Sequence, residues 1–334
     1  MTIAIIGAGP AGIEAAAVLA SQHNVTIFEK EDTILRNVRN KAFLFPDFTS
    51  ADELADKLES KLNNPNIKLK TNSKVESVTY ENSQWILKTE SEQLTFDAVL
   101  LATGYDVFDA KIKEELGYGI YEGVITSLDL EAMIKNRQIF NNIGERPKNV
   151  VFLQCVGSRD EKSGNNYCSK VCCVTAVKQA IEVKKQSPET DVFVFYIDLR
   201  MWGQGFEEMY REAQERYGVN FIRGRISEAA ATFDRRVQLK AEDTLLGNPL
   251  TLSTDLLVLM VGMCPSESSK ELCKQLQISG LYGFAESVSP HLGDNLTNQP
   301  RLYVAGACKR PVSINDSIQD ARAAACQMLA DLSE

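Results

Sequence analysis

The chain has little histidine, no long apolar run and no excess of positive charge. Only two histidines, His23 and His291, occur among 334 residues, so a metal site would have to rely mainly on thiolates. No apolar segment approaches the roughly 20 residues that a membrane-spanning helix needs. A net charge of −9 argues against nucleic acid or an anionic membrane as the main partner.

The N-terminus also lacks the basic segment and cleavage site of a secretory signal, because "MTIAIIGAG" leads directly into a strand and a turn. We therefore expect a cytoplasmic protein. In a reducing compartment, the eight cysteines are expected to bind metal or to do redox work rather than form structural disulfides. The length of the chain predicts one large or two medium domains.

The first thirty residues contain a dinucleotide-binding pattern. "IAII" is typical of a buried parallel strand, "IEAAAVLA" of a helix and "VTIFE" of a second strand. Between the first strand and the helix, Gly7, Gly9 and Gly12 have G-x-G-x-x-G spacing, with Pro10 and Ala11 between them. Such a loop lets a pyrophosphate approach the backbone at a helix N-terminus. Glu29, followed by Lys30, stands where an acid binds a ribose hydroxyl.

Two later segments favour FAD over NAD as the dinucleotide. "FDAVLLATGYDV" ends a strand in Ala102-Thr103-Gly104, which resembles the A-T-G signature of flavoproteins with two dinucleotide-binding domains. "RLYVAGACKRPVSINDSIQDARAAACQMLADL" resembles their closing strand, turn and helix, where a helix N-terminus faces the flavin. We expect Asn315, Asp316 and Ser317 to cap this helix.

The chain departs from that flavoprotein pattern in two places. The usual glycine pair after the acid is missing, so Asn40 and Lys41 are candidates for the floor of the flavin pocket. Gly306-Ala307 replaces the usual Gly-Asp near the C-terminus. Val75 occupies a position where related flavoproteins hold adenine through the backbone.

A second strand–helix pattern starts near residue 146 but lacks a glycine-rich loop. "NVVFLQ" predicts a strand, "SKVCCVTAVKQAIEVKKQ" a helix and "DVFVFYID" a further strand. "GFEEMYREAQERYG" predicts another helix, before strands at "VNFIRG" and "TDLLVLMVG". Gly157 is followed by no G-x-G-x-x-G, so we infer that an NAD(P)H site is absent from this unit.

Four cysteines lie in the segment that would hold that loop. Cys155 ends the predicted strand, Cys168 follows a polar loop, and Cys172 and Cys173 lie on the first turns of the helix. We expect Cys168 and Cys172 to share a helix face, because they are four residues apart. The helix N-terminus would favour an anion such as a thiolate-bound iron–sulfur cluster in the place of a phosphate.

Three further interpretations of these cysteines remain open on chemistry alone. Structural zinc usually takes paired C-x2–4-C knuckles, which this C-x12-C-x3-C-C run matches poorly. The cysteines could also form a redox dithiol, or they could be inert buried thiols. For the scattered Cys264, Cys273, Cys308 and Cys326 we expect ordinary core packing, and for Arg159, Arg200, Arg223 and Arg225 solvated surface positions.

"CVGSRDE", "YCSKVCC", "AVKQA" and "GFEEMYREAQERYGVNFIRGRISE" together resemble the A subunit of heterodisulfide reductases. The resemblance covers almost the whole chain. Methanogen members carry further ferredoxin-like cysteine motifs that this chain lacks, so we expect it to be closest to the heterodisulfide-reductase-like A subunit of sulfur-oxidising prokaryotes.

The resemblance implies FAD, a [4Fe-4S] cluster on Cys155, Cys168, Cys172 and Cys173, a homodimer, and assembly with B- and C-type subunits. It also places Lys178 beside the reactive edge of the flavin, whereas the sequence around Lys178 equally suits a solvated helix face. The alternative function is a self-contained NAD(P)H-dependent disulfide reductase.

The expected fold is α/β, with two Rossmann-like domains as in thioredoxin reductase. We predict a discontinuous FAD domain over residues 1–140 and 262–334, and an inserted cluster domain over residues 141–261. The predicted function is electron transfer within a heterodisulfide reductase-like complex of cytoplasmic sulfur oxidation.

Overall fold

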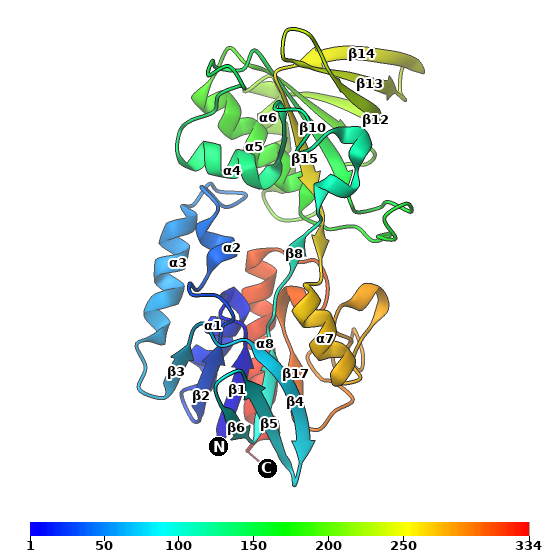
Figure 1. Ribbon diagram of the computed structural model, residues 1–334. Helices are drawn as coiled ribbons and strands as arrows, with labels where there is room; N and C mark the ends of the chain where they lie inside the picture. The colour runs from blue at the N-terminus through cyan, green and yellow to red at the C-terminus, as the bar shows by residue number, and fades with distance from the viewer. Residues whose placement is uncertain (334) are drawn as a thin grey trace. The chain divides into compact units, whose positions relative to one another are not determined.

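The structure is a computed structural model that describes residues 1–333, and it divides into two compact units. Unit 1 comprises Met1–Arg39, Asp52–Asp106 and the chain from Cys264 onward. Unit 2 comprises Asn40–Ala51 and Val107–Met263. Each unit is an α/β fold built around a largely parallel sheet, which confirms the predicted fold class (Figure 1).

Unit 1 contains a five-stranded parallel sheet in the order β17-β7-β1-β2-β3. Its strands are β1 (Thr2–Ile6), β2 (Asn24–Phe28), β3 (Ile67–Lys70), β7 (Ala98–Leu101) and β17 (Leu302–Val304). Residues 3–6 and 98–101 are buried throughout, as continuous apolar strands between two covered faces should be. A small antiparallel sheet is formed by β4 (Val75–Glu81), β5 (Gln84–Thr89) and β6 (Gln93–Phe96).

Helices of unit 1 cover both faces of the parallel sheet. They are α1 (Pro10–Leu19), α2 (Arg36–Arg39), α3 (Ala51–Glu59), α7 (Glu267–Gln275) and α8 (Ile314–Asp331). On one face, α1 and α8 lie side by side, with alanines of both helices in a fully buried core (Figure 1). On the other face, the antiparallel sheet and α7 enclose a second core that contains Trp85 and Phe28.

Unit 2 contains a seven-stranded sheet in the order β14-β13-β12-β11-β10-β15-β9. Its parallel strands are β9 (Val124–Thr126), β10 (Asn149–Val156), β11 (Asp191–Tyr196), β12 (Asn220–Ala231) and β15 (Leu256–Val261). An antiparallel extension adds β13 (Val237–Asp243) and β14 (Asn248–Thr254) beyond β12.

Three helices belong to unit 2, and its core lies between them and one face of the sheet. They are α4 (Ser127–Lys135), α5 (Cys172–Gln186) and α6 (Phe206–Glu215). Alternate residues of β10, Val150 and Phe152, face the apolar side of α5. Ala42 and three partly buried phenylalanines of the 40–51 segment pack on the same core.

The packing units differ in extent from the predicted cofactor domains. Residues 107–140, which we predicted with the FAD domain, pack in unit 2 because β9 pairs with β15 and α4 packs on α5. Packing units and cofactor domains need not coincide, so the predicted domain boundaries stay a prediction. Among residues 1–333, we find no helix of the length and apolarity needed to cross a membrane.

Candidate functional site

The glycine loop of unit 1 is a tight cradle between β1 and α1. Gly7 has a φ of +112°, and a Cβ there would lie 2.4 Å from the carbonyl oxygen of Ala102. A Cβ on Gly12 would lie 1.9 Å from the carbonyl oxygen of Gly7. Both positions therefore require glycine, whereas the corresponding space beside Gly9 is open. The backbone next to Gly9 is free for a ligand to approach.

Helix α1 begins directly after this cradle, as predicted. Gly9 is the N-cap residue, in an extended conformation and without a side-chain cap, and Pro10 occupies the first turn. The first N–H groups of a helix carry a partial positive charge and need acceptors. The loop and the helix start thus offer backbone donors of the kind that bind a pyrophosphate.

Several of the residues predicted to bind the dinucleotide line one pocket in unit 1. Its lining includes Gly7, Glu29, Lys30, Val75 and Thr103. One carboxylate oxygen of Glu29 accepts a hydrogen bond from the backbone N–H of Ala8 at 2.8 Å, which fixes the acid beside the glycine loop. The structure therefore brings together residues that are up to 96 positions apart in the sequence.

The C-terminal motif is built differently from our expectation. The N-cap of α8 is Ser313, which forms a capping box with Asp316, while Asn315 and Ser317 lie inside the helix. The capping prediction was therefore wrong for Asn315 and Ser317. Ser313 was missed although it stands three residues before an acid, which is the signature of a capping box.

A charged network holds the Gly306-Ala307 turn. The backbone N–H of Gly306 donates to Asp320 of α8 at 2.6 Å. The buried ammonium group of Lys309 bridges Asp320 and Asp294, at 2.7 Å and 2.9 Å. Asp320 thus supplies a carboxylate at the turn where the sequence pattern lacks the expected aspartate.

In unit 2, all four clustered cysteines are free, and Cys155 stands near the end of β10. The Sγ of Cys172 lies 3.9 Å from the carbonyl oxygen of Val261, the last residue of β15, and that of Cys173 lies 3.7 Å from the carbonyl oxygen of Asp198, just beyond β11. Since β10 lies between β15 and β11, these two thiols straddle its end, where Cys155 stands.

Helix α5 begins at Cys172, so Cys168 precedes it. The expectation that Cys168 and Cys172 share a helix face was therefore wrong, because the chain is irregular from Cys168 and bends at Lys170 and Val171 before the helix begins. Cys172 and Cys173 are buried, whereas Cys155 and Cys168 are partly exposed.

The backbone around these cysteines is strained. Cys155, Arg159 and Lys170 adopt positive φ angles of 62°, 52° and 61°, which side chains with a Cβ rarely do. A register irregularity in the pairing of β10 with β15 lies at the same place, between Leu153 and Val156. Such local strain costs on the order of 1–3 kcal/mol for each residue and is concentrated at functional sites.

The four thiols lie within electrostatic range of one another. Burial and then the neighbouring Cys173 raise the pKa of Cys155 to about 11, and burial followed by the other three cysteines raises the pKa of Cys172 well above its usual value. Free thiols at these two positions are therefore protonated near neutral pH. Within residues 1–333, no three histidine, cysteine, aspartate or glutamate side chains are arranged to hold a metal ion.

Lys178 is buried on α5 and belongs to a polar network inside unit 2. Its ammonium group pairs with Glu131 of α4 and donates to the carbonyl oxygen of Phe43 at 3.0 Å. The same carboxylate accepts from the backbone N–H of Ala42 at 3.0 Å and from the amide of Gln179 at 2.6 Å. With only 2% of Lys178 exposed, the interpretation as a solvated lysine is wrong.

Asn40 and Lys41 immediately precede this network along the chain, in the same unit. The structure thus brings Lys178 to the segment that was separately predicted to form the flavin floor. Glu131 was missed by sequence reasoning, because nothing in "DLEAMIK" distinguishes it from an exposed helix residue.

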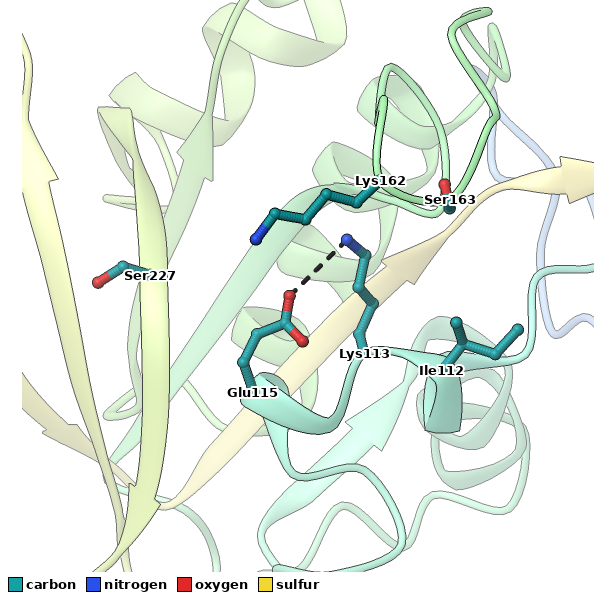
Figure 2. Close-up of a pocket in the computed structure, with 6 residues that line it drawn as sticks. All are labelled: Ile112, Lys113, Glu115, Lys162, Ser163 and Ser227. Carbon is teal, nitrogen blue, oxygen red and sulfur yellow. Dashed lines mark ion pairs between the residues drawn. The ribbon is translucent and has the colours of Figure 1, made fainter.

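Unit 2 also contains a polar hollow of about 340 Å³ beside the cysteine loop. It is lined by Ile112, Lys113, Glu115, Lys162, Ser163 and Ser227. Lys113 and Lys162 point toward Glu115 in Figure 2, and Lys113 also pairs with Asp160 at 2.5 Å. None of the predicted site residues lines this hollow, and we assign it no role.

Two expectations about single residues were wrong. Arg159 is largely buried rather than solvated, and it donates to Asp198 at 2.7 Å. Cys326 is exposed, whereas Cys273 and Cys308 are buried as expected for core residues.

Comparison with known proteins identifies relatives of the chain and of its fold. Residues 1–141 match the family described as pyridine nucleotide-disulphide oxidoreductase. The chain is 41% identical over 248 residues to the iron-sulfur A subunit of CoB–CoM heterodisulfide reductase from Methanocaldococcus jannaschii, covering 71% of the chain and 37% of the relative. It is 39% identical over 269 residues to the A subunit of the H(2)/formate:CoB-CoM heterodisulfide,ferredoxin reductase of Methanococcus maripaludis, covering 78% of the chain and 40% of that protein.

The chain therefore spans well under half the length of these curated relatives. Among solved structures, thioredoxin reductase of Lactococcus lactis has a TM-score of 0.71 at 19% identity, with 98% of each chain covered. Thioredoxin reductase of T. acidophilum has a TM-score of 0.69 at 19% identity, covering 99% of this chain and 98% of that one. These two likenesses show the fold.

Proposed function

Because the chain belongs to the family of heterodisulfide reductase A subunits, we propose that it is an electron-transfer oxidoreductase that holds FAD in unit 1 and a [4Fe-4S] cluster in unit 2. FAD exchanges electrons in pairs or singly and a cluster exchanges them singly, so the two together convert between these modes. The polypeptide supplies the binding sites and sets the potentials.

The residues of unit 1 suit FAD. The open backbone beside Gly9, the uncapped start of α1 and the carboxylate of Glu29 offer contacts for a pyrophosphate and a ribose. Ala102 and Thr103 close the cradle from β7, and the helix N-terminus of α8 follows the Gly306-Ala307 turn. Contacts of FAD with Gly104, Asn315 and Ser317 remain predictions from the sequence.

The grouping of four thiols at one strand end in unit 2 carries the proposal. Cys155, Cys168, Cys172 and Cys173 match the four thiolates that such a cluster takes. Each thiolate of a cluster binds a different iron atom, so the four sulfur atoms need not converge on a single point. Helix α5 begins at Cys172, and its partial positive charge favours an anionic cluster.

Further parts of the proposal rest on the family resemblance alone. These are assembly with B- and C-type subunits, a homodimer and a role in cytoplasmic sulfur oxidation. Lys178 remains our candidate for a cation in the flavin environment, supported by its burial and by its bond to Phe43 next to Asn40 and Lys41.

Metal analysis of anaerobically purified protein tests the proposal. We expect one FAD and four irons for each chain, and no zinc. Cys155→Ser and Cys173→Ser should lose the iron yet keep FAD bound, because the glycine cradle, Glu29 and Thr103 lie in the other unit.

Cys326→Ser is the matched control, since Cys326 is exposed and lies outside the group of four. Fewer than about two irons in the wild-type protein, or stoichiometric zinc, would contradict the cluster. Joint loss of flavin and fold in the Cys155 variant would instead indicate a structural metal.

A further inference from the structure

Two side chains next to Cys155 carry buried hydrogen-bonding groups that no described residue among 1–333 satisfies. They are the amide of Gln154 and the Nη1 group of Arg159. Leaving a buried polar group unpaired costs about 1–3 kcal/mol, so these groups call for a ligand.

Gln154 lies on the same sheet face and at the same end as the cysteines. It is 4% exposed and follows Val150 and Phe152 at intervals of two, so it shares the face that α5 covers. Helix α5 follows β10 in a parallel strand–helix–strand unit, so its first residues, Cys172 and Cys173, lie at the end of β10 where Gln154 stands.

Arg159 reaches the same group of thiols from the loop. Its backbone N–H donates to the carbonyl oxygen of Tyr167 at 2.8 Å, and its Nη2 donates to Asp198 at 2.7 Å. The guanidinium interacts electrostatically with Cys155, Cys168 and Cys173, and it also acts on the thiol of Cys155 as a hydrogen-bond donor. Asp198 thus holds the Nη2 group of the guanidinium, whereas the Nη1 group has no hydrogen-bond partner among the described residues.

We infer that Gln154 and Arg159 donate hydrogen bonds to the sulfur atoms of the cluster and thereby raise its reduction potential. This inference rests on the proposed function. The sulfur atoms of a cluster only accept hydrogen bonds, so they match the unpaired Nε2 and Nη1 donors, whereas the unpaired Oε1 of Gln154 needs a different partner. Donors and positive charge at the sulfurs stabilise the reduced cluster more than the oxidised one, because the reduced cluster carries one more negative charge.

The test is a redox titration of the cluster, followed by electron paramagnetic resonance, in the full-length protein with its iron content measured. Gln154→Leu removes the donor at nearly constant volume, and Arg159→Gln removes the charge. Each variant should keep FAD and iron but lower the equilibrium constant for cluster reduction about tenfold, which is about 59 mV for one electron. The cluster should remain reducible in both.

Arg223→Gln is the matched control. Arg223 also faces Asp198, at 3.8 Å, but its side chain is about half exposed. The cluster of the Arg223→Gln variant should have the same reduction potential as the wild-type cluster. Variants of Gln154 and Arg159 that retain iron and titrate unchanged would overturn the inference and leave the proposed function standing, whereas an iron-free wild-type protein would overturn the proposed function itself.

A second measurement uses the wild-type protein and therefore tests the inference even if the variants do not bind iron. Wild-type protein is grown with glutamine labelled with ¹⁵N at the side-chain amide, and its reduced cluster is examined by pulsed electron paramagnetic resonance. A ¹⁵N coupling to the cluster is expected from Gln154. No coupling would overturn the role of Gln154.

Discussion

At the scale of single residues, the Lys178–Glu131 pair is the most informative feature of unit 2. Both side chains are nearly inaccessible, and the carboxylate collects the ammonium group, the amide of Gln179 and the N–H of Ala42. Burial lowers the pKa of Lys178. Burial opposes ionisation of Glu131 as well, but the charge of Lys178 and the hydrogen bonds to the carboxylate outweigh it, so the pKa of Glu131 is lowered.

Lys178→Met should destabilise the protein strongly, because it leaves the carboxylate of Glu131 buried without its counter-charge. Removing one partner of a buried pair costs about 3–5 kcal/mol. The double variant Lys178→Met with Glu131→Gln should recover most of this loss, since no charge is then stranded. Urea unfolding of the wild-type, single and double variants at pH 7 measures the coupling.

Lys57→Met is the control, because Lys57 of α3 pairs with Glu53 at 2.6 Å and both side chains are exposed. It should cost less than about 1 kcal/mol. Equal losses in the Lys178 single variant and in the double variant would contradict the coupling. If the flavin potentials of the double variant equal those of the wild-type protein, Lys178 does not act on the flavin.

At the scale of elements, an ionic network joins α8 to the loop before β17. Lys309 links Asp294 of that loop to Asp320 of α8, and Arg310 also pairs with Asp294. Partial burial tends to raise the pKa of Asp294, but the hydrogen bonds from Arg310 and Lys309 outweigh it and hold the pKa at about 2.

This network should stabilise the fold in a pH-dependent way. The pKa of Asp294 is depressed in the folded state, so its contribution is present above the unfolded pKa near 4 and is lost as the pH falls toward 2. Asp294→Asn should therefore cost about 1–2 kcal/mol at pH 7. The gap between variant and wild type should shrink between pH 4 and pH 2, as followed by urea unfolding at several pH values.

Asp32→Asn serves as the control for this series, because Asp32 is exposed and takes no part in this ionic network. Its unfolding midpoint should follow that of the wild-type protein at every pH. A gap for Asp294→Asn that stays constant down to pH 2 would show that the lost contact is not electrostatic.

At the scale of the whole molecule, the two units have the same kind of sheet but different loops between a central strand and the helix that follows it. After β1, unit 1 has glycines, whereas after β10, unit 2 has a long polar loop that begins beyond Cys155 and ends at α5. A nicotinamide dinucleotide would need a tight glycine turn there to bring its pyrophosphate to the helix start. If this chain were a self-contained NAD(P)H-dependent disulfide reductase, the loop after β10 would not provide the glycine turn that its nucleotide needs.

NADH and NADPH should consequently reduce the flavin of the isolated protein slowly or not at all. Stopped-flow mixing under anaerobic conditions, with the flavin absorbance as the readout, measures this directly. Dithionite is the positive control, since it needs no nucleotide site. Fast stoichiometric bleaching by either nucleotide would favour a self-contained NAD(P)H-dependent reductase.

The sequence by itself determined the features that depend on local spacing. The glycine cradle, α1 with Pro10 in its first turn, and the alternation of strands and helices follow from steric limits and from hydrophobic period, both of which act over a few residues. The grouping of Cys155 with Cys172 and Cys173 was also predictable, because a parallel strand–helix unit returns the helix start to the end of its strand.

Only the tertiary structure decided the partners of buried polar groups. Three such pairs are Glu131 with Lys178, Asp320 with Gly306 and Asp198 with Arg159, which lie 47, 14 and 39 residues apart. The sequence does not distinguish these partners from other polar residues. Likewise, only the folded structure shows that buried donor groups of Gln154 and Arg159 have no hydrogen-bond partner among the described residues. The physical reason is that a buried polar group needs a hydrogen-bond partner nearby in space, and the order of residues along the chain does not specify which residue that partner is.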